Sequence, residues 1–171
     1  MIVVRSEEEA KQYGQIVLVE GSLIWVRTEK GLLKVYKTPS KEEVAKILVA
    51  NRFPKRLVKL WQEGNYQETP SLKKALSVPK ENWLFLSGSC GSGKTFTLVV
   101  KTATLLENYQ VFSPFYFSFV YSPNLDQEDL DRSDLIVLDD FTPSERNIAI
   151  LKKVVFYAYD EEKTLYLASN L

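Results

Sequence analysis

Histidine is absent from this chain of 171 residues, and cysteine occurs once. A single cysteine cannot form a disulfide within the chain, and the lack of histidine excludes metal sites built from cysteine and histidine. Cys90 has no histidine that could activate it as a nucleophile, so we expect it to be a small residue of a loop. The sequence therefore excludes a disulfide scaffold and a zinc module.

Long hydrophobic runs are also lacking. The most apolar stretch, residues 111–120, is too short to span a bilayer and contains Pro114. The N-terminus turns acidic within nine residues and lacks the basic-then-apolar order of a signal peptide. The 45% hydrophobic and 26% charged residues are those of an ordinary globular protein. These features predict a cytoplasmic protein with no membrane partner.

There is no net charge of either sign, because 22 basic and 22 acidic residues balance. The balance hides an asymmetry: residues 1–80 carry 15 Lys/Arg and 9 Asp/Glu, whereas residues 81–171 carry 7 and 13. A basic N-terminal half predicts contact with a polyanion such as DNA, or docking on an acidic partner. An ordinary lysine-rich, solvated surface would have the same composition, and this alternative stays open.

The pattern of elements predicts two domains, at residues 1–78 and 79–171. The first is a small α+β module: a helix over 6–14, strands over 15–20, 23–27 and 32–36 with a hairpin, and helices over 41–50, 55–63 and 72–77. In the second, we expect strands over 83–87, 111–119, 134–139 and 164–169, helices over 93–107 and 144–159, and a weak turn near 126–130. Alternating strands and helices predict an α/β fold with a parallel sheet between helices.

A glycine-rich loop follows the strand expected over 83–87. It reads G-x-x-x-x-G-K-T, from Gly88, Ser89, Cys90, Gly91, Ser92 and Gly93 to Lys94 and Thr95, with Phe96 next in the helix. A strand, this loop and a helix start form the context in which the motif binds phosphate. Lys94 would reach the β- and γ-phosphates, and Thr95 would offer its hydroxyl to Mg²⁺. The sequence thus predicts a site for a nucleoside triphosphate and Mg²⁺.

Two later strands end in polar residues. The apolar run 135–138 is followed by Asp139 and Asp140, which is a Walker B pattern. Asp139 would hold Mg²⁺, directly or through water, and Asp140 would polarise a water that attacks the γ-phosphate. Asn170 follows the strand 164–169, where an amide can hydrogen-bond the same water or a phosphate oxygen. Asp and Asn also commonly mark plain turns after strands, which is the alternative at these positions.

Three segments together resemble the AAA+ ATPases, and in particular the bacterial helicase-loader and transposition-helper branch of DnaC and IstB, with the related DnaA. They are residues 84–95 (LFLSGSCGSGKT), 133–141 (SDLIVLDDF) and 164–171 (TLYLASNL). The resemblance covers residues 80–171 and implies an ASCE-type P-loop fold. It also implies roles for Lys94 and Thr95 in Walker A, Asp139 in Walker B, Asp140 as the catalytic carboxylate and Asn170 as sensor 1.

The resemblance implies that the protein is an ATPase of DNA replication or transposition. It also implies a helicase or transposase as partner and a homo-oligomeric form. The chain stops one residue after Asn170, whereas the family continues with a fifth strand, an arginine finger and usually a lid. We therefore expect a truncated core that binds ATP and hydrolyses it weakly alone. Arg132 and Arg146 could supply an arginine, although surface positions near element ends explain both more simply.

A basic cluster in the N-terminal half comprises Arg52, Lys55, Arg56 and Lys59, and the aromatic residues of the same half include Trp25, Tyr36, Trp61 and Tyr66. Basic residues beside aromatic ones suit phosphate contact and base stacking. Leu57, Leu60 and Trp61 have helical spacing, however, which favours a buried face. DNA contact and a protein-binding surface both remain open.

Two other functions are compatible with the P-loop. A small-molecule kinase would need a phosphoacceptor pocket and an arginine-bearing lid, and residues 81–171 contain only Arg132 and Arg146 as arginines. A non-hydrolysing regulatory module would use bound ATP only as a structural switch. Turnover that depends on a metabolite would indicate the first, and tight ATP binding without turnover the second.

Overall fold

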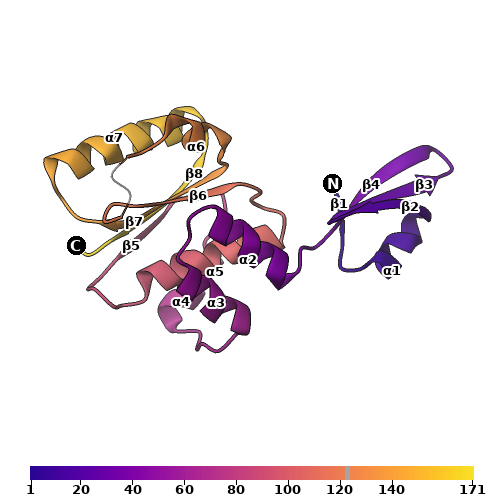
Figure 1. Cartoon of the computed structure of the whole chain (residues 1–171), viewed down its shortest axis with the longest axis horizontal. Helices are drawn as coiled ribbons and strands as arrows, with labels where there is room; N and C mark the ends of the chain where they lie inside the picture. Colours follow the sequence, from indigo (N-terminus) through magenta and orange to yellow (C-terminus); the bar gives the residue numbers. More distant parts are fainter. Residues whose placement is uncertain (122–123) are drawn as a thin grey trace. The chain divides into compact units, whose positions relative to one another are not determined.

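The structure, a computed structural model, describes residues 1–121 and 124–171 (Figure 1). The chain forms two compact units, Met1–Lys41 and Glu42–Leu171. Each unit has a sheet and a hydrophobic core of its own. In the described part of the chain, every helix is too short or too polar to cross a bilayer.

The first unit is a four-stranded sheet with a short helix against one face. Its elements are β1 (Ile2–Val4), α1 (Glu7–Ala10) with a 3-10 turn (Lys11–Tyr13), β2 (Gln15–Glu20), β3 (Leu23–Thr28) and β4 (Gly31–Lys37). The strand order is β1-β4-β3-β2, with β1 parallel to β4 and the other pairs antiparallel. The predicted hairpin of β3 and β4 is confirmed, and β1 is an addition.

Strand alternation explains why this small sheet has a core. Val4, Ile24, Val26 and Val35 lie on the face toward α1 and pack around its Ala10. All five are at most 1% exposed. Because successive strand residues point to opposite faces, the side chains between them lie on the other face of the sheet.

The second unit is built on a parallel sheet in the order β5-β8-β7-β6. Its elements are α2 (Lys41–Ala50), α3 (Lys55–Glu63), α4 (Pro70–Ser77), β5 (Leu84–Ser87), α5 (Lys94–Glu107), β6 (Pro114–Ser118), α6 (Gln127–Arg132), β7 (Leu135–Phe141), α7 (Glu145–Asp160) and β8 (Thr164–Ser169). Figure 1 shows α6 and α7 on one face of this sheet and α2 to α5 on the other. The predicted α/β fold with a parallel sheet between helices is confirmed.

Helices on both faces give the unit two apolar cores. Val137 and Ala168 belong to the cluster that contains Leu98 of α5, whereas Ile136 and Leu138 belong to the cluster that contains Val154 of α7. Consecutive residues of β7 therefore face different helices, and its apolar run has no solvent-facing side. This double burial fixes the carboxyl end of β7, which carries Asp139 and Asp140.

The division of the chain differs from the one that the sequence pattern predicted. The structure divides between residues 41 and 42, not between 78 and 79. Helices α2, α3 and α4 place Leu48, Trp61 and Leu72 in the same core as Leu98 of α5. The spacing of apolar residues shows that a helix buries one face, but it does not show which partner covers that face.

One strand is shorter than predicted. The strand expected over 111–119 spans Pro114–Ser118, because the carboxylate of Asp134 accepts hydrogen bonds from the backbone N–H groups of Phe112 (2.8 Å) and Ser113 (3.0 Å). These two residues therefore belong to a turn tied to the start of β7. The weak turn expected near 126–130 is the helix α6.

Candidate functional site

The loop between β5 and α5 has a backbone conformation that depends on glycine. Gly91 and Gly93 have φ values of 78° and 85°, in the left-handed region that residues with a Cβ rarely adopt. α5 then begins at Lys94 and runs for 14 residues. Its first turn has unpaired N–H groups and the positive end of the helix dipole, which together attract an anion.

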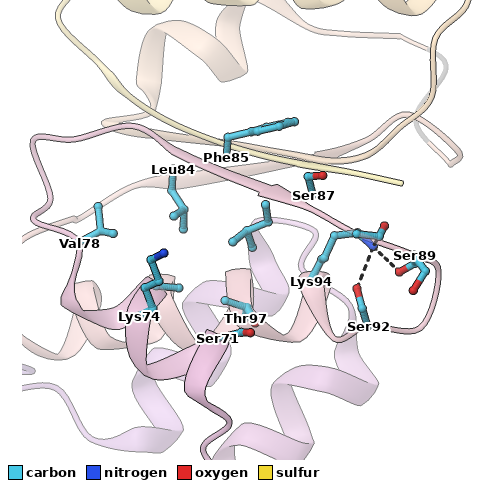
Figure 2. Close-up of a pocket in the computed structure, with 13 residues that line it drawn as sticks. Ser71, Lys74, Val78, Leu84, Phe85, Ser87, Ser89, Ser92, Lys94 and Thr97 are labelled. Atoms are coloured by element: carbon cyan, nitrogen blue, oxygen red, sulfur yellow. Dashed lines mark hydrogen bonds between the residues drawn. The ribbon is translucent and has the colours of Figure 1, made fainter. Parts of the chain in front are cut away.

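Lys94 folds back over this loop. Its ammonium donates to the carbonyl oxygens of Gly88 (2.8 Å) and Ser89 (2.7 Å) and to Ser92 Oγ (3.2 Å), as Figure 2 shows. Three uncharged oxygen atoms thus hold one positive charge at the mouth of the loop. A phosphate oxygen carries a negative charge and is a stronger partner for the same ammonium.

Thr95 and Asp139 meet although they are 44 residues apart in sequence. Thr95 Oγ1 donates to Asp139 Oδ2 at 2.7 Å, and the backbone N–H of Asp140 donates to Asp139 Oδ1 at 2.8 Å. The carboxylate of Asp139 is buried, with the residue 1% exposed. A hydroxyl and a carboxylate are hard oxygen ligands of the kind that Mg²⁺ prefers, so this pair fits the predicted ion. No cluster of three or more Asp, Glu, Cys or His side chains suited to a metal occurs among the described residues.

Tyr116 of β6 also contacts this carboxylate, and the sequence reasoning missed it. Its hydroxyl donates to Asp139 Oδ2 at 2.6 Å. Burial, together with the charge of Asp139, raises the pKa of Tyr116 well above its usual value, so the hydroxyl keeps its proton. The signal in the sequence that could have identified it is a tyrosine within the apolar strand that precedes the Asp139 strand along the chain. Its meaning depends on the pairing of β6 with β7, which the sequence does not state.

Asp140 has an unusual environment. Its φ of 55° is left-handed, and its side chain is partly buried, with Ser118 Oγ at 3.5 Å from its Oδ2. Burial and then the charge of Asp139 raise the pKa of Asp140, against the opposing effects of Ser118 and Lys94. A carboxylate with a raised pKa is a better proton acceptor, which suits the polarisation of a water.

Asn170 follows β8 at the same edge of the sheet, and hydrogen bonds hold the chain around it. Ser169 Oγ donates to the carbonyl oxygen of Phe141 at 2.9 Å, and Ser87 Oγ donates to that of Leu171 at 2.7 Å. Because β8 lies between β5 and β7, this residue is carried between the P-loop and the Walker B carboxylates. The structure thus places the glycine-rich loop, Asp139, Asp140 and Asn170 at one edge of the sheet.

Phe96 and Cys90 contribute differently. The ring of Phe96 packs edge-on against that of Tyr66, with 4.9 Å between centroids, so it faces the helical core and not the phosphate loop. Cys90 is an exposed free thiol within the loop. A cavity of about 450 Å³ opens beside the loop, along β5 and α4, and the sequence reasoning missed Ser71 and Lys74 in its wall (Figure 2). A cavity of this size can hold the nucleoside part of a nucleotide.

The two candidate arginines lie at opposite edges of the sheet. Arg132 ends α6 just before β7 begins, and its guanidinium pairs with Glu128 of the same helix. It therefore lies at the amino edge, at the other end of β7 from Asp139, which agrees with the surface position that the sequence favoured for it. Arg146 lies in the first turn of α7, which follows the carboxyl end of β7.

The basic cluster and the aromatic residues that the sequence grouped together belong partly to different units, since Trp25 and Tyr36 lie in the first and the cluster lies in the second. Arg52 forms an ion pair with Asp129 of α6 at 3.3 Å, and Lys59 pairs with Glu63 at 3.7 Å. Trp61 is 2% exposed and belongs to the core. Base stacking at this place is therefore excluded for Trp61, and Tyr66 is partly buried against Phe96.

A glycine-rich loop at the start of α5, its lysine and a threonine–aspartate pair at the carboxyl edge of a parallel sheet define a P-loop nucleotide-binding fold. No protein-family model matches the chain, and no curated protein matches it in sequence. Solved structures match it in fold. The AMPPCP-bound DnaA from Aquifex aeolicus is 22% identical, with 66% of this chain and 38% of that chain covered and a TM-score of 0.42.

Two further structures are similar. DnaI is 18% identical, with 58% of this chain and 60% of that chain covered and a TM-score of 0.44. The DnaC helicase loader is 18% identical, with 59% and 67% covered and a TM-score of 0.42. The chain thus spans about two fifths of DnaA and three fifths of DnaI. These likenesses to DnaA, DnaI and DnaC are at 18–22% sequence identity.

Proposed function

We propose that this chain is an ATP-binding and ATP-hydrolysing accessory protein of DNA replication or transposition, of the helicase-loader or transposase-helper type. One observation supports the proposed binding of ATP. It is the Thr95–Asp139 hydrogen bond of 2.7 Å beside the glycine-rich loop, whose carbonyl oxygens bind the Lys94 ammonium. The DNA part rests on the resemblance of three segments to loaders and helpers, and on the basic N-terminal half.

Each residue has a distinct part in this proposal. Lys94 exchanges its three loop oxygens for the β- and γ-phosphate oxygens of ATP, and Thr95 and Asp139 hold the Mg²⁺ that offsets phosphate charge. Asp140 accepts the proton of an attacking water, and Asn170 hydrogen-bonds that water. The arginine that completes such a site would come from outside residues 1–171 or from a second copy of the chain, and Arg146 at the site's edge is the alternative.

The first test is Lys94→Ala, assayed by calorimetric titration with ATP and Mg²⁺. We expect a loss of affinity of at least about 100-fold, because the variant removes the charge that contacts two phosphates. Lys73→Ala, an exposed lysine on α4, is the matched control and should bind as the parent chain does. Equal affinities of the parent and Lys94→Ala would remove the P-loop from the proposal.

Phosphate release in the presence of DNA separates the proposed function from its two competitors. An accessory ATPase should turn over slowly alone and faster with DNA or at higher protein concentration, where a second copy can supply an arginine. Turnover that requires a small metabolite and ignores DNA would indicate a kinase. Tight ATP binding with no phosphate release under any of these conditions would indicate a regulatory module.

A further inference from the structure

The sheet of the first unit has one face that α1 does not cover. We call it the open face and define it by six side chains: Leu18, Leu23, Trp25, Arg27, Lys34 and Tyr36. The register places them opposite the core residues Ile24, Val26 and Val35 along the same strands. None of the six is buried.

Two aromatic rings lie on this face beside a cation. Trp25 of β3 pairs with Lys34 of β4 on one side and, across a bulge in β2, with Leu18 on the other. The Lys34 ammonium lies 4.8 Å from the centre of the Trp25 ring. Tyr36 is two residues beyond Lys34 on β4, which makes Trp25 and Tyr36 diagonal neighbours, about 7–8 Å apart by the general geometry of paired strands.

Charge is unevenly divided between the two faces of the unit. Glu7, Glu8 and Glu9 form the first turns of α1, which lies against the opposite face. Arg27 and Lys34 lie on the open face, and the register places Glu20 beside Leu23 at one end of the same face. The open face thus has two cations and one carboxylate around its aromatic rings, whereas Lys11 and Lys37 on the α1 side pair with Glu8 and Glu7.

We propose that the open face binds single-stranded nucleic acid. Aromatic rings on a sheet stack unpaired bases, and Lys or Arg beside them contacts the phosphates of the backbone. A duplex hides the faces of its bases, so the open face should prefer a single strand. A protein partner could also cover the apolar residues, but Arg27 and Lys34 lie on the same face as the rings, with Glu20 as one carboxylate at its end, and this balance favours a polyanion.

This inference deepens the DNA-related part of the proposed function and rests on it, whereas it uses no residue of the nucleotide site. It also replaces the DNA contact predicted near residues 52–59, where the aromatic side chain is buried. Of the four aromatic residues that the sequence grouped, Trp25 and Tyr36 are the two on a sheet face with accessible cations.

The test is fluorescence anisotropy of a labelled oligothymidylate of about 20 nucleotides, long enough for one such site, titrated with the full chain at low salt without ATP. We expect saturable binding that weakens as salt rises, because phosphate contacts release counterions. Trp25→Ala and Lys34→Glu should each weaken binding by about tenfold. A duplex of the same length should bind more weakly than the single strand.

Lys11→Glu is the matched control, because it makes the same charge reversal at an exposed lysine on the α1 side of the unit. Circular dichroism shows whether Trp25→Ala folds, and the exposed Lys34→Glu keeps the test decisive if it does not. No oligonucleotide binding, equal losses in Lys34→Glu and Lys11→Glu, or tighter binding of the duplex would each overturn the proposal. Lys94→Ala should bind the oligonucleotide normally, so failure of the ATP site and failure of the open face give different results.

Discussion

At the scale of single residues, the carboxylate of Asp139 is held by more groups than a metal ligand strictly needs. Its Oδ2 accepts hydrogen bonds from Thr95 and Tyr116, and its Oδ1 accepts the backbone N–H of Asp140. Thr95 would be an ion ligand itself, whereas Tyr116 lies behind the site in β6. Tyr116 is therefore a positioning residue, since it fixes the direction in which Asp139 presents its oxygens.

Tyr116→Phe should raise the Mg²⁺ concentration needed for half-maximal ATP binding by about tenfold, while ATP binding without Mg²⁺ stays unchanged. Titration of Mg²⁺ at fixed ATP, followed by nucleotide fluorescence, measures this. Tyr166→Phe is the control, because Tyr166 is equally buried and its hydroxyl has no hydrogen-bond partner among the described residues. The same Mg²⁺ dependence in both variants would show that Tyr116 only fills space.

Asp140→Asn should retain ATP and lose hydrolysis by at least about 100-fold, because the amide cannot accept the proton of water. It should also stabilise the fold at neutral pH, since the folded-state pKa of Asp140 is raised and its charge is disfavoured there. At pH values below the usual aspartate pKa the carboxyl is neutral in both states and the two proteins should be equally stable. The difference in stability between Asp140→Asn and the parent develops as pH rises through the folded-state pKa of Asp140.

Thermal unfolding at several pH values checks this second effect, which should stay below about 1 kcal/mol because solvent screens a partly exposed group. Asn is among the residues that best tolerate a left-handed backbone, so the φ of 55° should not obscure the result. A variant that is less stable than the parent at neutral pH would contradict the assigned cause of the raised pKa.

At the scale of elements, α5 carries Lys94 at its first residue and also holds the end of α4. Lys101 of α5 is 2% exposed, and its ammonium donates to the carbonyl oxygens of Leu76 (3.2 Å) and Val78 at the end of α4. Burial lowers the pKa of this lysine. The contact ties the last turn of α4, before β5, to the helix that carries Lys94.

Lys101→Met should lower the free energy of unfolding by about 1–3 kcal/mol, because it leaves buried carbonyl oxygens without a donor. Urea unfolding followed by circular dichroism measures the loss. Lys73→Met changes an exposed lysine of α4 in the same way and should fall within about 0.5 kcal/mol of the parent. Equal unfolding curves for the two variants would show that the α4–α5 contact is not stabilising.

At the scale of the whole molecule, the units do not follow the charge pattern. Residues 1–41 carry 7 Lys/Arg and 5 Asp/Glu, so only part of the basic character of the N-terminal half belongs to the first unit. The rest lies in residues 42–80, which contain most of α2 and all of α3 and α4 and belong to the second unit. The basic residues of the N-terminal half are therefore divided between the two units, and Arg27 and Lys34 of the first unit lie on the open face.

A fragment of residues 42–171 should fold and bind ATP as the full chain does, because it keeps the complete core around Leu98. A fragment of residues 79–171 should lack cooperative unfolding, because it loses the buried side chains of α2, α3 and α4. Thermal melting and ATP titration of both fragments provide the measurement. A stable, ATP-binding 79–171 fragment would restore the boundary that the sequence pattern predicted.

Local sequence signals predicted most of the second unit. The motif at residues 88–95, the apolar run before Asp139 and the helix and strand lengths all follow from spacing within a few residues. Tyr116 could not be found in this way, because its role comes from a neighbouring strand that is distant along the chain. Helices α2 to α4 were placed correctly as elements and assigned to the wrong domain for the same reason.

The sequence by itself determined which chemical groups are available: a lysine and a threonine in a glycine-rich loop, two aspartates and an asparagine after buried strands, and no histidine or second cysteine. Only the tertiary structure decided their neighbours. The placement of β8 between β5 and β7 and the Tyr116–Asp139 hydrogen bond are long-range pairings, and Trp25 and Trp61 belong to different units. Apolar periodicity selects helices and strands and their buried faces, but contacts between distant elements form only when those faces pack together.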